Sequence, residues 1–278
     1  MTGTAIRIAV IGSAGRMGRM LVDVIHRDGG AVLSAVVDRP GSDVVGMDAG
    51  ELAGIGAVGL PVTDDPATAV AEADVVIDFT LPEATPAVAA ACRAAGCALV
   101  LGTTGLGPRE QRAVENLSEA LPVVQAPNYS TGVTLLTALV EQAAAVLGHS
   151  VDVEIIEAHH RHKVDAPSGT ALHLGEAVAG ATGRDLSACA VYGREGHTGP
   201  RARQTIGFET IRAGDIVGEH TVLFAGEGER LELTHRASSR ATFAAGAVRA
   251  AHWVVGRAPG LYNMRDVLGI GGHASGER

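Results

Sequence analysis

The first half of the chain alternates short apolar runs with segments whose apolar positions recur at helical spacing. Residues 6–11 form an apolar run that ends at Gly12, and apolar side chains then recur every three or four positions from Met17 to Ile25. A second apolar run follows at 31–37. This pattern predicts a strand, a glycine turn, a helix and a second strand.

The alternation continues to about residue 130. Residues 73–80, 97–105 and 122–130 predict further strands with their turns, and helices are predicted over 82–96 and about 108–120. Strands separated by helices of this length imply right-handed crossovers. We therefore expect a parallel, doubly wound sheet.

The pattern changes after Tyr129. We expect a long helix from about 130–132 to Leu147, followed by a strand over 151–158 with one wet face. Residues 189–212 show little periodicity and predict a long mobile loop. Two antiparallel strands are predicted at 217–226 and 229–237, joined by a G-E-G turn. Helical spacing returns over 240–268, and we expect the glycine-rich tail at 269–278 to fray.

The predicted fold class is therefore α/β, with a Rossmann-type doubly wound parallel sheet and a second α+β domain built on a mixed, largely antiparallel sheet. We place the first domain at residues 1–130 plus 240–278 and the second at 131–239. The chain would leave the first domain once, build the second, and return.

Composition narrows the class of protein. Hydrophobic residues make up 46% of the 278 and aromatic residues only 3%, a balance that suits parallel sheets covered by helices. The net charge of −9 and the lack of a basic stripe argue against nucleic acid. No apolar run reaches the roughly 20 residues of a membrane helix, and no signal peptide is visible. We expect a soluble cytoplasmic protein that binds neither nucleic acid nor membrane.

The three cysteines and the glycine-rich first turn differ in what they predict. The cysteines lack metal-ligand spacing, so we expect reduced thiols and no metal.

Gly12, Gly15 and Gly18 form G-x-x-G-x-x-G between the first strand and helix, where a pyrophosphate can approach the backbone. An ordinary glycine turn is the alternative. Asp38, 20 residues after Gly18 at the end of the second strand, favours a dinucleotide site.

Charged residues near this turn bear on which cofactor binds. Asp38 is suited to the adenine ribose hydroxyls, whereas Arg39 or Arg16 is suited to a 2′-phosphate. Both arginines are equally compatible with solvated surface charge. An acid beside two arginines predicts that NADH and NADPH are both accepted. The turns at 102–105 and 126–130 end successive strands and are candidates for the nicotinamide side.

A cationic segment, HHRHK, holds Lys163, the single lysine among 22 basic residues. Pro167 and Gly169 predict a turn, after which Ser168 or Thr170 caps a helix near Ala171. Cations facing a helix N-terminus favour a carboxylate or phosphate. A zinc site, a solvated basic turn and a cofactor phosphate anchor are the alternatives. A lone compact ammonium beside histidines favours anion binding with proton transfer.

The segment around this cluster, EIIEAHHRHKVDAPSGTA at 154–171, resembles the signature of the 4-hydroxy-tetrahydrodipicolinate reductase (dihydrodipicolinate reductase) family of bacterial lysine and diaminopimelate synthesis. VIGSAGRMG, DFTLPEAT, LGTTG, APNYSTGV, IRAGDIVGEH and THRASSRATFAAGA also resemble family segments, in the family's order. The resemblance covers nearly the whole chain. It implies NAD(P)H-dependent reduction of 4-hydroxy-tetrahydrodipicolinate, a cyclic imine dicarboxylate, to tetrahydrodipicolinate with loss of water.

The resemblance also implies roles for individual residues. His159 and Lys163 match the family's proton donors, and the substrate contacts are His160, Gly169, Thr170 and Thr104. The cofactor contacts are Gly12, Ser13, Ala14, Gly15, Arg16 and Met17 at the pyrophosphate, Asp38 and Arg39 at the adenosine, and Gly102, Thr103, Thr104, Ala126, Pro127, Asn128 and Tyr129 at the nicotinamide.

For the whole molecule, the resemblance implies a dinucleotide-binding first domain and a second domain for substrate binding and oligomerisation. Family members are homotetramers assembled through the sheet of the second domain. Tyr129 stands where other members often have Phe, and the tail after Leu268 is longer. Two other readings of the residues remain: a different NAD(P)H-dependent amino- or keto-acid dehydrogenase, and a nucleotide-sensing regulator, which would need a basic DNA-binding helix pair.

Overall fold

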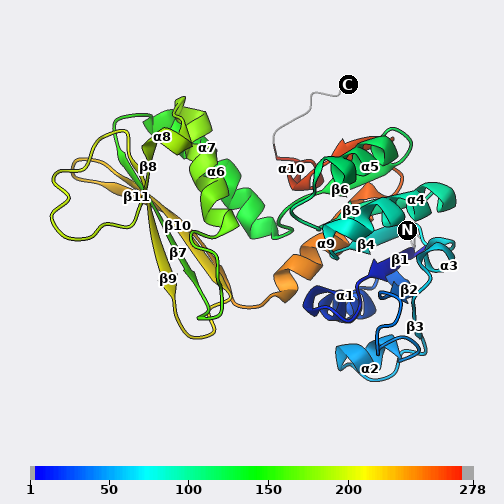
Figure 1. Cartoon of the computed structure of the whole chain (residues 1–278). Coiled ribbons are helices and arrows are strands. Elements are labelled where there is room, and N and C mark those ends of the chain that lie inside the picture. Colours follow the sequence, from blue (N-terminus) through cyan, green and yellow to red (C-terminus); the bar gives the residue numbers. More distant parts are fainter. Residues whose placement is uncertain (1–3, 271–278) are drawn as a thin grey trace. The chain divides into compact units, whose positions relative to one another are not determined.

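The computed structural model describes residues 4–270, which divide into two compact units (Figure 1). One unit holds the residues up to Thr131 together with those from Ala241 onward, and the other is Gly132–Arg240. Most of the tail predicted to fray, 271–278, lies outside the described residues. Among 4–270, no helix combines the length and apolar character that a bilayer span requires.

A seven-stranded sheet forms the centre of the first unit, in the order β12-β6-β5-β4-β1-β2-β3 with every ladder parallel. The strands are β1 (Ile6–Ile11), β2 (Ala31–Val37), β3 (Val62–Thr63), β4 (Val75–Asp78), β5 (Ala98–Leu101), β6 (Pro122–Gln125) and β12 (Gly260–Tyr262). The strand order reverses between β1 and β4. The predicted parallel, doubly wound sheet is confirmed.

Helices cover both faces of this sheet. One face carries α1 (Arg16–Arg27), α2 (Ala49–Ala53), α9 (Ala241–Val254) and α10 (Met264–Leu268), and the other carries α3 (Pro66–Val70), the short η1 (Pro82–Ala84), α4 (Thr85–Ala95) and α5 (Pro108–Ser118). Within β1, Ile8 and Val10 belong to the first core, whereas Ala9 and Ile11 belong to the second. Because both faces are covered, the strand is apolar from Ile8 to Ile11.

Four short elements of the first unit differ from the sequence-based expectations. The elements α2, β3 and α3 were not predicted, and β12 lies inside the 240–268 stretch that was predicted to be helical. Strand β12 pairs with β6 at the edge of the sheet. Two or three residues do not carry a measurable period, so pairing with a neighbouring strand, and not local pattern, decides their conformation.

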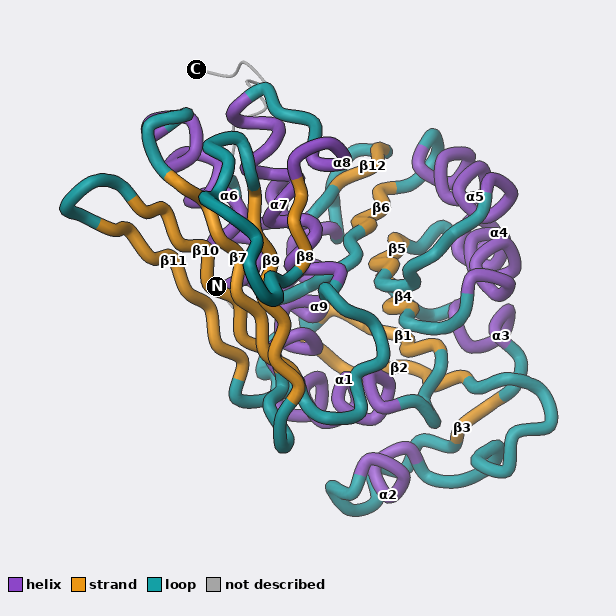
Figure 2. The backbone as a smooth tube through the Cα atoms, turned by 60° about the vertical axis from the view of Figure 1, so that its left-hand side comes forward, coloured by secondary structure: helices purple, strands orange, loops and turns teal. Residues whose placement is uncertain are grey.

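The second unit contains a five-stranded sheet in the order β11-β10-β7-β9-β8 (Figure 2). The strands are β7 (Asp152–His159), β8 (Ala190–Tyr192), β9 (Ile206–Arg212), β10 (Gly218–Ala225) and β11 (Arg230–Ala237). The ladders β10–β11 and β10–β7 are antiparallel, and β7–β9 and β8–β9 are parallel. The mixed sheet is confirmed.

The loop predicted over 189–212 is wrong at both ends. Residues 190–192 form β8, and 206–212 form β9, which lies between β7 and β8. In the sequence IGFETIR the buried positions Ile206 and Phe208 flank a glycine, and polar residues follow. Only the first half of the strand is buried, so the sequence lacks the sustained alternation of apolar and polar residues that would have predicted a strand.

Helices α6 (Thr131–Leu147) and α7 (Gly169–Thr182) pack on one face of this mixed sheet, with the short α8 (Leu186–Cys189) beside α7. The core beneath them includes Val153 and Ile155 of β7 and Val222 of β10. Side chains alternate along a strand, so Glu157 and His159 of β7 point to this same covered face. The predicted cap is also confirmed, because Ser168 Oγ accepts a hydrogen bond from the amide of Ala171 at 3.1 Å.

Candidate active site

The glycine turn after β1 is closed by contacts that leave no room for side chains. Gly12 has φ +84°, and a Cβ at Gly18 would lie 2.2 Å from the carbonyl oxygen of Gly12 and 2.7 Å from the Cα of Ser13. The amides of Gly12 and Ser13 both donate to the carbonyl of Val37 in β2, at 2.8 and 3.1 Å. The turn is therefore packed tightly against both the start of α1 and the end of β2.

Asp38 continues this arrangement from β2. Its Oδ2 accepts a hydrogen bond from the amide of Ala14 at 2.7 Å, and its Oδ1 accepts one from the amide of Arg39 at 2.9 Å. The carboxylate is nearly buried and faces the glycine turn, yet each oxygen retains acceptor capacity. The structure thus brings the predicted ribose-binding acid beside the predicted pyrophosphate loop.

Unused donors at this edge fit an anionic, hydroxyl-rich ligand. The N-cap of α1, Gly15, offers no side-chain cap, so the first-turn amides of the helix have no intrahelical partner. The hydroxyls of Ser13 and Thr103 are buried and lack a hydrogen-bond partner within residues 4–270. Buried hydroxyls without partners are costly unless a bound group satisfies them. The residues present therefore fit a dinucleotide.

The turns after β5 and β6 come together as expected. They form a pocket of about 380 Å³, lined by Thr103, Thr104, Gly105, Leu106, Gln111, Gln125, Ala126 and Pro127. A Cβ at Gly102 would lie 2.1 Å from the ring of Phe79, which fixes glycine there. Tyr129 is buried, and its hydroxyl lies 2.9 Å from the carbonyls of Leu101 and Val124. Its side chain therefore belongs to the core of the first unit.

Two arginines near the glycine turn have no partner in the described part of the chain. Arg16 and Arg39 are both exposed, and no hydrogen bond or ion pair within residues 4–270 holds either guanidinium. Each guanidinium is free to meet an anion, which suits the predicted 2′-phosphate contact.

The end of β7 in the second unit carries a network of buried polar side chains. His159 Nδ1 lies 2.5 Å from Glu157 Oε2. Glu157 is 1% exposed and His159 9% exposed. Glu157 also accepts both guanidinium arms of Arg212, at 2.8 Å each, and the amide of Ser168 at 3.1 Å. The end of β7, the end of β9 and the start of α7 therefore meet at one carboxylate.

Burial and charge shift the pKa values in this network. Burial opposes ionisation of Glu157, but the hydrogen bonds from Arg212 and His159 outweigh it and lower the pKa of the carboxyl. Burial lowers the pKa of His159, and Glu157 offsets part of that effect. His220, whose Nε2 lies 3.0 Å from Ser168 Oγ, has its pKa lowered to about 4 by burial. His159 therefore gives up its proton at a lower pH than an ordinary histidine does, because its pKa is lowered.

The other predicted residues of the cationic segment are also paired. Lys163 Nζ lies 2.8 Å from both carboxylate oxygens of Asp165, and His160 Nε2 lies 3.0 Å from the guanidinium of Arg240. An ammonium group has three protons, so Lys163 retains capacity for a second anion. Gly169 and Thr170 begin α7, where the first-turn backbone amides have no acceptor within the helix.

Sequence reasoning missed Glu157, Arg212, Ser168 as a network member and His220. The available signal was the spacing in β7: Glu157 continues the alternation of Val153 and Ile155, so its carboxylate had to be buried. No sequence signal identified Arg212 as its partner, because Arg212 lay inside the predicted loop.

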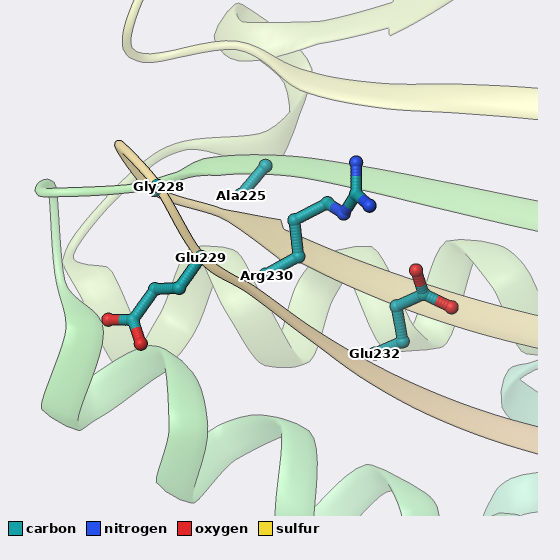
Figure 3. Close-up of a pocket in the computed structure, with 6 residues that line it drawn as sticks. Ala225, Gly228, Glu229, Arg230 and Glu232 are labelled. Atoms are coloured by element: carbon teal, nitrogen blue, oxygen red, sulfur yellow. The ribbon is translucent and has the colours of Figure 1, made fainter.

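A pocket of about 740 Å³ in the second unit lies elsewhere. It surrounds the hairpin tip between β10 and β11 and is lined by Ala225, Gly226, Gly228, Glu229, Arg230 and Glu232 (Figure 3). Ala225 pairs with Asp152, at the opposite end of β7 from His159. No predicted site residue lies there. Within residues 4–270, no group of three or more His, Cys, Asp or Glu side chains is arranged to hold a metal ion.

Two family models match the chain, and the boundary between them lies near Thr131, where the first unit is interrupted by the second. A family described as dihydrodipicolinate reductase, N-terminus, matches residues 6–129, and one described as dihydrodipicolinate reductase, C-terminus, matches residues 132–268. Together the two matches span nearly all of the described residues.

Individual relatives are similar over almost their full length. The chain is 69% identical over 263 residues to a 4-hydroxy-tetrahydrodipicolinate reductase of Halorhodospira halophila, covering 95% of this chain and 98% of that protein. It is 69% identical over 264 residues to that of Alkalilimnicola ehrlichii, covering 95% and 99%. Among solved structures, the dipicolinate-bound dihydrodipicolinate reductase of Paenisporosarcina sp. TG-14 matches with TM-score 0.74 and 25% identity, over 94% of this chain and 98% of that one.

Proposed function

Because this chain belongs to the dihydrodipicolinate reductase family, we propose that His159 and Lys163 carry the proton transfer and substrate binding of the family's reaction. The protein is an oxidoreductase that uses a nicotinamide dinucleotide to reduce 4-hydroxy-tetrahydrodipicolinate to tetrahydrodipicolinate, with loss of water, in diaminopimelate and lysine biosynthesis. The alternatives of an unrelated dehydrogenase and a nucleotide-sensing regulator are thereby set aside.

The carrying observation for the proton donor is the Glu157–His159 pair. When bound, a reduced nicotinamide would supply hydride, and negative charge would then develop at the ring nitrogen of the substrate. His159 is nearly buried, and its Nδ1 is hydrogen-bonded to the carboxylate of Glu157. Its Nε2 has no hydrogen-bond partner within residues 4–270. The proton on Nε2 is therefore available to quench that charge.

The substrate is a dianion, and its binding draws on cations and backbone amides. We assign one carboxylate to Lys163, His160, Gly169 and Thr170, with Thr104 as a further contact. The single ammonium of the chain and the first-turn amides of α7 supply positive charge and donors, respectively. Dipicolinate, bound in the Paenisporosarcina structure, is a planar dicarboxylate of the same class.

For the cofactor, we propose that both NADH and NADPH are accepted. Asp38 faces the glycine turn and is suited to ribose hydroxyls, and the unpaired guanidiniums of Arg16 and Arg39 are suited to the extra phosphate of NADPH. Gly12 to Met17 would hold the pyrophosphate, and the turns 102–104 and 126–129 would flank the nicotinamide. The first unit thus serves as the dinucleotide-binding domain and the second as the substrate-binding domain.

We propose that the active form is a homotetramer assembled through the face of the mixed sheet opposite α6 and α7. Ile211 of β9 is 48% exposed there, and Val191 of β8 is exposed on the same face. Exposed apolar side chains at adjacent strands favour contact with another subunit. Light scattering of the full chain at micromolar concentration should report the mass of four chains. A monomer mass would contradict the assembly.

We also propose that the enzyme works in the cytoplasm. Its three cysteines are free, as expected for a reducing compartment. Fractionation of cells carrying the native protein should recover the reductase activity with other cytoplasmic enzymes.

The proposed acid is tested with His159→Gln, assayed by absorbance at the nicotinamide band with synthase-generated substrate and each cofactor in turn. Loss of a general acid should lower kcat on the order of 10²–10³-fold. The dissociation constant for the cofactor should stay unchanged, since His159 belongs to the other unit. A variant that kept the kcat and pH profile of the wild type would show that His159 is not the acid.

A further inference from the structure

Glu157 is the most heavily bonded carboxylate near the proposed proton donor. Within residues 4–270 it accepts five hydrogen bonds, and it is nearly inaccessible to solvent. The donors are Ser168 N at 3.1 Å, Thr210 Oγ1 at 3.3 Å, both arms of Arg212 at 2.8 Å and His159 Nδ1 at 2.5 Å. A carboxylate held from so many directions has one orientation, so its bond to His159 is equally fixed.

The strand register explains why these donors converge. In the parallel ladder, Glu157 pairs with Thr210 and His159 pairs with Arg212. Glu157 and His159 are two positions apart, so both side chains point to the covered face of the sheet. Arg212 rises beside His159 and turns back to Glu157, and it also donates to the carbonyl of Asp165 at 2.6 Å.

We propose that Glu157 is a positioning residue, which holds His159 through Nδ1 so that the proton given to the substrate is the one on Nε2. This inference rests on the proposed role of His159 as the acid. In the protonated imidazolium both nitrogens carry a proton. Glu157 retains the one on Nδ1 as a charge-assisted hydrogen bond, the N–H bond at Nε2 breaks, and neutral imidazole remains until solvent restores the proton.

The space around Nε2 agrees with this assignment. A Cβ at Gly218 of β10 would lie 3.1 Å from His159 Nε2, so any larger residue at that position would crowd this ring nitrogen. His220, on the same strand, packs edge-to-face on His159 with ring centres 5.1 Å apart. The ring is thus held at Nδ1 and packed on one side, whereas Nε2 has no hydrogen-bond partner within residues 4–270.

The groups that face His159 determine how its protonation responds to Glu157. Burial favours neutral imidazole, and so do the charges of Lys163 and Arg212, whereas Glu157 favours imidazolium. His220 faces the ring from β10, and His235 of β11 pairs with His220. Removing the charge of Glu157 takes away the anion that favours the proton, so the pKa of His159 falls. Activity that requires imidazolium is then lost at a lower pH on the alkaline side.

A purely structural role for Glu157 is the competing explanation, since the Arg212 pair also joins β7 to β9. Such a role would change the temperature of unfolding without moving the pH dependence of kcat. The pH profile and the tautomer of His159 separate the two explanations.

The test uses the full chain with Glu157→Gln, His159→Gln and a matched control, Glu176→Gln. Glu176 forms an exposed pair with His173 on α7, 3.7 Å apart. The Glu176→Gln variant therefore also removes a carboxylate beside a histidine, but away from the network. We expect Glu157→Gln to lower kcat about 10–100-fold and to move the alkaline limb of the kcat–pH profile to lower pH. Cofactor affinity should not change, and Glu176→Gln should match the wild type.

Two outcomes distinguish the inference from the proposed function. A Glu157→Gln enzyme with the kcat and pH profile of the wild type, alongside an inactive His159→Gln enzyme, would overturn the inference and leave His159 as the acid. Full activity of His159→Gln would overturn the proposed function itself.

A second measurement does not depend on a variant that folds. Nitrogen-15 spectra of the wild-type protein labelled at histidine report which ring nitrogen of neutral His159 carries the proton. We expect Nδ1–H with an unprotonated Nε2. A predominantly Nε2–H form would overturn the inference, whatever the stability of Glu157→Gln.

Discussion

The carboxyl edge of the parallel sheet and the end of β7 in the mixed sheet are built from different materials. The first is a backbone structure: Gly12, Gly15 and Gly18 bring main-chain groups close together, and the free donors are amides of α1. The second is a side-chain structure, in which Glu157 and Arg212 form a buried ion pair that orients His159. One region offers shape and dipole, and the other offers charge and a proton.

This difference has a physical reason. A dinucleotide keeps the same pyrophosphate throughout the reaction, so fixed amides at close range are sufficient to bind it. The substrate changes its charge during the reaction, so its site needs groups that exchange protons and are held in one tautomer. Substitutions should therefore separate the two regions, with effects on substrate chemistry at one and on cofactor affinity at the other.

The largest effect is expected from Lys163→Gln. Loss of the only ammonium near the acid removes a charged contact to the dianionic substrate, and kcat/KM should fall on the order of 10²–10³-fold. Lys163→Arg should restore little, because a planar fork replaces a compact cation. Steady-state kinetics with substrate in excess and cofactor titration by fluorescence give both quantities. Comparable weakening of cofactor binding would break the separation between the two regions.

Gly18→Ala should produce the next largest effect, and it should act on the other region. The added Cβ meets backbone atoms that have no room to move, so overpacking of about 1–3 kcal/mol is expected. If the turn has to shift to make room for the Cβ, its amides are displaced from the pyrophosphate, and the dissociation constant for the cofactor should rise roughly 10-fold or more. At saturating cofactor, the KM for the substrate should stay within about twofold of the wild type.

Gly29→Ala is the matched control for that glycine. Gly29 lies just beyond α1, and nothing lies within 4 Å of an added Cβ. The control variant should bind cofactor like the wild type. If both alanine variants lost affinity equally, the close packing of Gly18 would not be the cause.

The smallest effect is expected from Arg39→Ala. Its guanidinium has no partner within residues 4–270 and is proposed to contact the 2′-phosphate, so the KM for NADPH should rise about 10-fold while that for NADH changes little. Initial rates with each cofactor measure this ratio, and the rise should shrink at high salt because the contact is exposed. Equal effects on both cofactors would remove Arg39 from the proposed phosphate contact.

The two regions also differ in how far the sequence predicted them. The glycine turn is local: β1, Gly12, α1 and Asp38 follow one another within 33 residues, Ile6 to Asp38, so spacing alone predicted this arrangement of strand, turn, helix and acid. The network at His159 joins residues that are distant in the chain. Arg212 and His220 reach it through sheet pairing, and Arg212 lay in the stretch predicted as a loop.

Local pattern therefore predicted the segment 159–170 and its helix cap, but not the partners that give it chemistry. The same limit explains β12 and β3, whose two or three residues form strands only because a neighbouring strand pairs with them. Long-range pairing was the missing information in each case.

Ser168 makes three contacts with one side chain and one amide. Its hydroxyl caps α7 and is hydrogen-bonded to His220, and its amide donates a hydrogen bond to Glu157. Natural variation or laboratory redesign at this position would shift anion affinity and proton delivery at the same time. A lineage that adapted to a bulkier ring would have to alter its acid together with its binding helix.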